Sequence, residues 1–218
     1  ILAVLALFFL AVAWLLPNKA YPWLPAWIEG FAFIASFAMW LSAVAYHREG
    51  RTGNPGVSWP LAAFCATAVV TAFVQYAMGM LVFYGDAVIL LLYLGTYLLA
   101  VHAAALMTTS KEREGWLDGL MATMALAGIL CGGIALAQWT HTWGLAVFFM
   151  ESEIGERPGA NLGQINHVNT LCFLSLCAIF FLLHRRKIRT IPFFLASIFI
   201  TLGMALTQSR TGWLQIAF

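Results

Sequence analysis

Two arginines stand apart from the other cations of this 218-residue chain. Arg157 precedes a segment rich in side-chain amides, and Arg210 lies in residues 207–213, TQSRTGW, where Gln208, Ser209 and Thr211 flank it. The planar guanidinium binds a phosphate or pyrophosphate through two parallel hydrogen bonds, which an ammonium group does less well. The pair therefore indicates a site for an anionic head group. Arg210 has a second interpretation, as an anchor that extends its charge to a membrane interface.

The other polar feature is a cluster that lies close to residue 165. Its members are Asn161, Gln164, Asn166, His167 and Asn169. At helical spacing Asn166 and Asn169 share one face with Thr170, and His167 is offset by one position. Such side chains line a cavity or form hydrogen bonds between helices. His167 either belongs to a binding site or is an ordinary structural histidine, because the sequence supplies no partner that would orient it.

The composition places these residues in a membrane protein. Hydrophobic residues make up 62% of the chain and charged residues only 9%, against about 45–50% and about 25% in ordinary soluble domains. These values exclude a secreted disulfide module, a disordered tail and a nucleic-acid-binding domain, and a net charge of +2 is too small for a phosphate-backbone footprint. The sequence predicts an all-α, polytopic transmembrane helix bundle.

Hydropathy locates the spans, each of which needs about 20 apolar residues. We expect seven complete spans and the start of an eighth near residue 211. The seven lie at 1–16, 27–46, 58–78, 86–107, 117–140, 162–183 and 191–208. Because both ends of the chain interrupt apolar runs, we expect the chain to be the N-terminal part of a longer protein. We expect residues 1–218 to form a single transmembrane domain.

Cytoplasmic loops of membrane proteins carry an excess of Lys and Arg, and this excess sets the orientation. Most of the eleven Lys and Arg residues lie in alternate loops; these are Arg48, Arg51, Lys111, Arg113, Arg185, Arg186, Lys187 and Arg189. Lys19, Arg157 and Arg210 lie on the other side, and the loop at 141–161 carries Glu151, Glu153 and Glu156. The N-terminus is therefore expected in the cytoplasm and the loop 141–161 outside.

Cysteines and small residues are expected to serve packing. Cys65, Cys131, Cys172 and Cys177 all fall within spans, and their spacing matches no metal or haem pattern. We expect no disulfide, no metal and no cofactor. Gly128 and Gly132 form a Gly-x-x-x-Gly pair, which allows two helices to approach closely.

Residues 156–167, ERPGANLGQINH, together with TQSRTGW at 207–213, resemble the bacterial O-antigen ligase superfamily, and most closely its branch of pilin-type protein O-oligosaccharyltransferases. Three weaker stretches agree: Pro17-Asn18 with Tyr21-Pro22-Trp23, Gln75-Tyr76 with Gly79, and Tyr84-Gly85-Asp86. The resemblance implies a glycosyltransferase of the bacterial inner membrane. Its donor is an oligosaccharide on undecaprenyl pyrophosphate at the periplasmic face, and its acceptor is a Ser or Thr hydroxyl of pilin or another exported protein. The reaction is expected to need no metal and to invert the anomeric carbon.

The resemblance also assigns roles to residues. Arg210 matches the family's Ser-Arg-Thr arginine and is expected to bind the pyrophosphate, beside Ser209. Arg157, Gln164, Asn166 and His167 are expected to shape the donor or glycan pocket. The family's acceptor-activating histidine lies in a large periplasmic loop that is expected beyond Phe218. No catalytic residue is therefore assigned within this chain, which is expected to be catalytically incomplete.

Four other functions stay open. An O-antigen ligase, with the sugar of lipid A–core as acceptor, and a polymerase belong to the same superfamily. A transporter of an anionic lipid or solute is a different class, whose members tend to have broken helices and midplane charges in matched halves. A purely structural membrane subunit leaves the two outer arginines unexplained.

Overall fold

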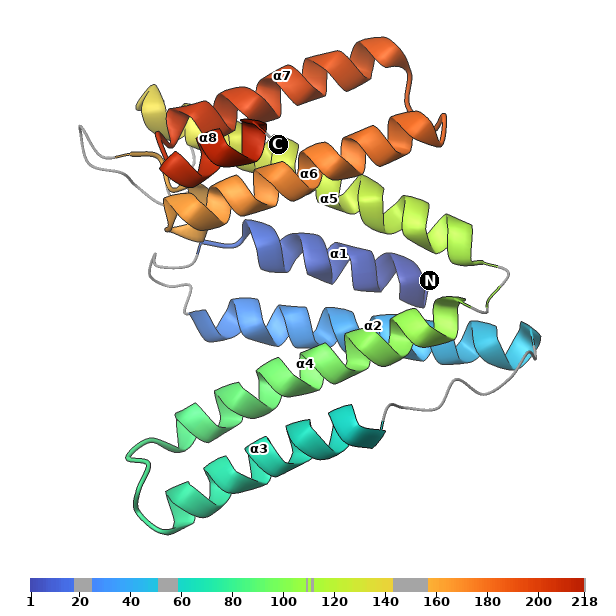
Figure 1. Cartoon of the computed structure of the whole chain (residues 1–218), viewed down its shortest axis with the longest axis vertical. Coiled ribbons are helices and arrows are strands. Elements are labelled where there is room, and N and C mark those ends of the chain that lie inside the picture. Colours follow the sequence, from blue (N-terminus) through green and yellow to red (C-terminus); the bar gives the residue numbers. More distant parts are fainter. Residues whose placement is uncertain (18–24, 51–58, 109, 111, 143–156, 218) are drawn as a thin grey trace. The chain divides into compact units, whose positions relative to one another are not determined.

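The computed structural model describes residues 1–17, 25–50, 59–108, 110, 112–142 and 157–217, and these contain helices and no strand (Figure 1). The α-helices are α1 (Leu2–Leu15), α2 (Pro25–Gly50), α3 (Trp59–Ala77), α4 (Tyr84–Thr108), α5 (Arg113–Trp139), α6 (Ile165–His184), α7 (Thr190–Leu206) and α8 (Arg210–Ala217). A 3₁₀ turn, η1 (Ala160–Leu162), precedes α6. Helices are expected here because an apolar solvent forces each backbone N–H and C=O to find its partner within the chain.

Five helices among the described residues are long and apolar enough to cross a membrane: those at Trp27–Tyr46, Trp59–Ala77, Tyr84–Thr108, Arg113–Trp139 and Ile165–His184. The expected all-helical membrane architecture is confirmed at this level. The expected number of seven spans is not confirmed, because α1 has 14 residues and α7 has 17. Both are apolar but shorter than the length of about 20 residues that crosses the hydrocarbon. The residues near 211 form the eight-residue helix α8.

The start of the sixth span differs from its prediction. Residues 160–162 form η1, and α6 begins only at Ile165. Ala160 has φ +44° and Gly163 has φ +66°, so the chain turns twice through the left-handed region before the helix starts. The amide-rich stretch is thus a short turn followed by the first turn of α6.

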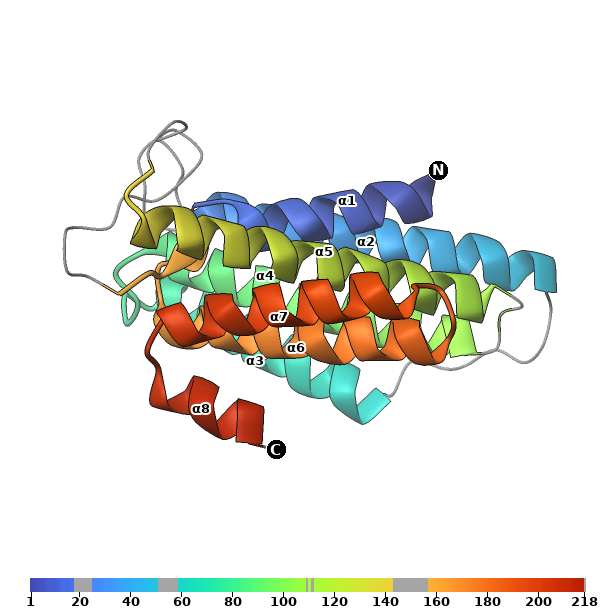
Figure 2. The ribbon, with the colours of Figure 1, turned by 90° about the horizontal axis from the view of Figure 1, so that it is seen from above.

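The helices divide into two compact units, and each is described by itself. The first comprises Ile1–Leu10 and Glu29–Trp116. In it α3 and α4 pack side by side as an antiparallel hairpin (Figures 1 and 2). Trp40 of α2 donates a hydrogen bond from Nε1 to His102 Nδ1 of α4 at 3.0 Å. Trp40 also packs against the buried residues Ala43, Ala103 and Leu106.

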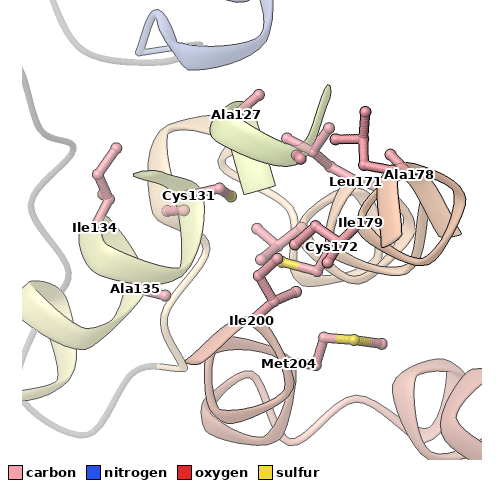
Figure 3. Close-up of a cluster of buried hydrophobic side chains, with 14 residues drawn as sticks. Ala127, Cys131, Ile134, Ala135, Leu171, Cys172, Ala178, Ile179, Ile200 and Met204 are labelled. Carbon is pink, nitrogen blue, oxygen red and sulfur yellow. The ribbon is translucent and has the colours of Figure 1, made fainter. Parts of the chain in front are cut away.

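The second unit comprises Ala11–Ile28 and Leu117–Phe218 and contains the candidate residues. Its buried core brings together Cys131 of α5, Cys172 of α6, and Ile200 and Met204 of α7 (Figure 3). The helices α6 and α7 form an antiparallel hairpin, and α8 packs against α6 (Figures 1 and 2).

Glycines let these helices approach closely, as the Gly-x-x-x-Gly pair predicts. A methyl group added at Gly128 of α5 would collide with the Ser175 side chain of α6. One added at Gly203 of α7 would lie 2.8 Å from the Cα atom of Gly132. The same stripe of α5 therefore contacts α6 at Gly128 and α7 at Gly132.

Some residues used in the topology and in the resemblance lie outside the described residues. They are Asn18, Lys19, Tyr21, Pro22, Trp23, Arg51, Lys111, Glu151, Glu153, Glu156 and Phe218.

Candidate functional site

A buried polar network joins the first turns of α6 to the turn between α7 and α8. Its centre is Asn169, which has no exposed surface. Asn169 Nδ2 donates one hydrogen bond to the Ile165 carbonyl oxygen at 3.0 Å and another to Thr207 Oγ1 at 2.8 Å. These two acceptors fix which atom of the amide is nitrogen, so Oδ1 faces the other way. Asn169 thereby ties α6 to the end of α7.

The turn between α7 and α8 is closed by two hydroxyl groups. Thr207 Oγ1 donates to the Met204 carbonyl oxygen at 2.7 Å and accepts the Ser209 backbone N–H at 3.3 Å. Ser209 Oγ donates to Asn166 Oδ1 at 2.9 Å. Gln208 lies between them with φ +50°, in the left-handed region. The hydroxyl groups therefore hold a sharp bend at the point where α8 begins.

The first half of α8 lies directly on Asn169. A methyl group added at Gly212 would lie 2.7 Å from Asn169 Oδ1 and 3.0 Å from its Cγ atom. Oδ1 is buried and has no hydrogen-bond partner within the described part of the chain. The close approach needs a glycine at this position because any larger residue would displace either the helix or the amide.

Arg210 is the first residue of α8 and is exposed. It directly follows Ser209, whose side chain is 5% exposed and bonded to α6. The backbone of Arg210 is thus held by a fixed neighbour, while its guanidinium is open to a ligand. The N-terminus of α8 is also the positive end of the helix dipole, which favours an anion at the same place.

Arg157 is exposed too and leads into the turn before α6. The next residue, Pro158, is buried. Ala160 forms two hydrogen bonds with the Gln138 side chain: its N–H donates to Oε1 at 2.8 Å, and its carbonyl oxygen accepts from Nε2 at 3.1 Å. Asn161 Nδ2 donates to the Leu15 carbonyl oxygen at 2.7 Å. The turn that carries Arg157 is therefore fixed to α5 and α1.

The structure brings some of the candidate residues together and leaves others apart. It joins Asn166 to Ser209, which precedes Arg210. It places Gln164 at the N-cap of α6 with no side-chain cap hydrogen bond, and His167 on the exposed surface of the first turn. Within the described residues, no hydrogen bond joins Arg157 to Asn166 or Ser209. The roles of all six residues stay predictions.

The sequence places Asn169 in the polar cluster but does not assign it to the site, and it does not identify Thr207, Gly212 or Gln138 as supporting residues. Asn169 and Thr207 are the buried centre of the network, and Gly212 allows α8 to approach. The shared helical face of Asn166 and Asn169 predicts hydrogen bonds between helices as one alternative, and the bond from Asn169 to Thr207 is of this kind. Gln138 had no such signal, because its partner Ala160 contributes only backbone atoms.

No metal site is formed by the residues that the structure describes. Among them, no group of three or more His, Cys, Asp or Glu side chains lies together as a ligand set. The polar groups near Arg210 are amides and hydroxyls, which suit hydrogen bonding to phosphate oxygens rather than tight binding of a transition metal.

Comparison with known proteins finds a similar protein in Acinetobacter baylyi. Its general O-oligosaccharyltransferase is 27% identical over 218 residues, which is 98% of this chain and 36% of the relative. The chain therefore spans about a third of the length of that relative. No family model matches the chain, and no solved structure matches it. The similarity agrees with the sequence motifs and supports membrane glycosyl transfer at the level of a family.

Proposed function

We propose that the protein transfers an oligosaccharide from undecaprenyl pyrophosphate to a Ser or Thr hydroxyl of an exported protein such as pilin, at the periplasmic face of the inner membrane. The observation that carries the proposal is the position of Arg210. Its charge lies at the N-terminus of α8, on a bend held by Thr207, Ser209 and the α6 amides. The similarity to an O-oligosaccharyltransferase supports the class of reaction.

In the proposed reaction the acceptor hydroxyl oxygen attacks the anomeric carbon of the donor sugar. The bond from that carbon to the pyrophosphate oxygen breaks, and its electron pair stays on the departing pyrophosphate. The hydroxyl proton passes to a base, for which no residue of this chain is assigned. Negative charge grows on the leaving group in the transition state, so a fixed cation there stabilises the transition state more than the ground state.

The polar network fixes the backbone beside Arg210, which supports this role. A donor group contributes most when it is already aimed at the developing charge and does not reorganise during the reaction. Asn166 anchors Ser209, the residue before Arg210, and Asn169 holds Thr207. Arg157, Gln164 and His167 are exposed near the start of α6, and we assign them to the pocket for the glycan.

The proposal is tested with Arg210→Ala and Arg210→Lys in the full-length protein. We expect the alanine variant to reduce glycan transfer to pilin by at least about 100-fold, the range found when one transition-state donor is removed. The lysine variant should also be impaired, because an ammonium group does not make the paired hydrogen bonds of a guanidinium. Transfer is measured by the mass shift of pilin, with membrane abundance measured by immunoblot.

Arg113 is a matched control, because it is likewise an exposed arginine at the first residue of a helix. Arg113→Ala should leave transfer unchanged. Near-normal transfer by either Arg210 variant at normal abundance would show that the pyrophosphate role is wrong. Transfer to lipid A–core instead of pilin would leave the role of Arg210 intact and reassign the acceptor.

A further inference from the structure

The turn between α6 and α7 carries a dense group of cations at the end of the hairpin opposite the candidate site (Figure 1). Asp118 of α5 holds two of them. Its Oδ1 atom lies 3.3 Å from Arg185 Nε, and its Oδ2 atom lies 2.8 Å from Lys187 Nζ. The carboxylate is only 13% exposed, so this contact fixes the turn against α5 and neutralises part of its charge.

Arg186 and Arg189 remain exposed, and within the described part of the chain neither has a carboxylate partner. Arg186 adopts φ +56° where the end of α6 is closed by the hydrogen bonds Arg186 N–H to Leu183 O and Lys187 N–H to Leu182 O. Glycine usually occupies the left-handed position in such a helix end. An arginine there directs a positive charge to the surface in spite of the less favourable backbone.

An apolar groove of about 380 Å³ lies between α6 and α7 close to this turn. It is lined by Leu176, Cys177, Phe180, Phe193 and Ser197. At 1.5 Å per residue, Phe193 lies about 6 Å and Ser197 about 12 Å along α7 from Arg189. One leaflet of the hydrocarbon is about 15 Å deep. Phe193 and Ser197 therefore lie within the depth that a single acyl chain reaches from the head group.

We propose that this end of the α6–α7 hairpin is a binding site for an anionic phospholipid of the bilayer. Arg186 and Arg189 bind the phosphate of the head group, and the groove below them holds one acyl chain. Charge complementarity selects the head group, because cations beside a membrane helix attract anionic lipids. The sequence predicts this turn on the cytoplasmic side, so the site is independent of the proposed glycosyl transfer on the opposite face.

The test uses the purified full-length protein in detergent, titrated with dioleoyl-phosphatidylglycerol or with dioleoyl-phosphatidylcholine. These lipids share their acyl chains and differ in head-group charge. Native mass spectrometry counts the bound lipids and gives their affinities. We expect the phosphatidylglycerol to bind more tightly. The double variant Arg186→Gln/Arg189→Gln should weaken its binding about thirty-fold, from about 1 kcal/mol for each cation near an anionic surface, and leave phosphatidylcholine unchanged.

Ser197→Leu fills the groove and should weaken both lipids, and Cys177→Leu repeats this test from α6. Arg113→Gln removes an exposed arginine elsewhere and should change neither affinity. Equal affinities for the two lipids, or equal effects of the double variant and the Arg113 control, would overturn the proposal. So would unchanged lipid binding in both groove variants, as expected if a protein segment fills the groove. Binding of inorganic phosphate as tight as that of phosphatidylglycerol would also overturn it, because the site would then recognise a free anion.

Discussion

Asn169 is buried completely, yet only one side of its amide is bonded. Nδ2 has two acceptors, and Oδ1 faces the backbone of α8 at Gly212 without a partner in the described part of the chain. An unpaired buried acceptor is unfavourable for the free energy of folding. The contact between the Asn169 amide and Gly212 nevertheless fixes where α8 lies, because the amide fills the space that a side chain at position 212 would occupy.

This contact predicts coupled effects of two substitutions. Gly212→Ala places a methyl group 2.7 Å from Asn169 Oδ1 and should lower the free energy of unfolding by about 1–3 kcal/mol, as overpacking does. Asn169→Ala should lower it too, by breaking the bond to Thr207, which is worth about 0.6 kcal/mol for polar contacts between membrane helices. In the double variant the methyl group has room, so the loss should be smaller than the sum.

The measurement is reversible unfolding in mixed detergent for the two single variants and the double variant. Gly30→Ala is the control, because a methyl group there meets nothing within 4 Å, and it should be neutral. Additive losses would contradict a direct contact between Asn169 and Gly212.

For single residues, the sequence identifies the polar side chains in apolar surroundings but does not predict which of them form hydrogen bonds with one another. Asn166 and Ser209 were recognised because polar side chains in apolar surroundings are conspicuous. Their mutual hydrogen bond joins positions 43 apart in sequence, and no local pattern encodes such a partner. Asn169 is the same kind of residue, but its burial depends on α8, whose position a single sequence does not specify.

Among the helices, small residues decide which pairs are in contact. Gly132 of α5 faces Gly203 of α7, and a methyl group at Gly203 would lie 2.8 Å from the Gly132 Cα atom. The Gly128–Gly132 pair was readable as a packing motif from its spacing. Its partners were not, because Ser175 and Gly203 lie on two different helices further along the chain.

Gly203→Ala should be more damaging than Gly212→Ala. At Gly203 the added methyl group meets backbone, which cannot rotate away, whereas at Gly212 it meets a side-chain amide. We expect a loss of about 3 kcal/mol in the free energy of unfolding, at the upper end of the usual cost of overpacking. Gly133→Ala on α5 is the control, because its methyl group would be in ordinary contact, 3.8 Å from Phe199 Cζ. Equal free energies of unfolding for Gly203→Ala and the Gly133→Ala control would show that α5 and α7 do not approach closely at Gly132.

Helix positions were more predictable than helix limits. Each expected span overlaps a helix, because a run of apolar residues in lipid has no other way to satisfy its backbone. The start of α6 was placed three residues early, since the apolar and amide residues continue without a proline through 160–164. Gly163 was the available signal, and its φ of +66° marks the turn that delays the helix.

For the whole molecule, the distribution of charge carries the functional argument. The candidate site and the proposed lipid site lie at opposite ends of the α6–α7 hairpin (Figure 1). If the hairpin crosses the bilayer, Arg210 and Arg186 must face opposite compartments. A donor that carries its glycan outside the cytoplasm requires the Arg210 end to be periplasmic. The orientation that the Lys and Arg distribution predicts is therefore a condition of the proposed function.

Cysteine accessibility tests this orientation. In a variant lacking Cys65, Cys131, Cys172 and Cys177, a single cysteine is introduced as Gly155→Cys or as Arg186→Cys. A membrane-impermeant maleimide is added to spheroplasts, and labelling is read by a gel shift. We expect Cys at 155 to react and Cys at 186 to be protected until the cells are lysed, because loops rich in Lys and Arg stay in the cytoplasm.

Each outcome has a distinct consequence for the site. Reaction at 186 with protection at 155 would place Arg210 in the cytoplasm, where it could not act on a periplasmic donor, and would exclude the proposed transfer at that face. Reaction at both positions before lysis would mean that α6 does not separate them across the membrane. With only position 155 labelled, the Arg157 and Arg210 end faces the periplasm, and the loss of transfer in Arg210→Ala can be assigned to the site rather than to an inverted protein.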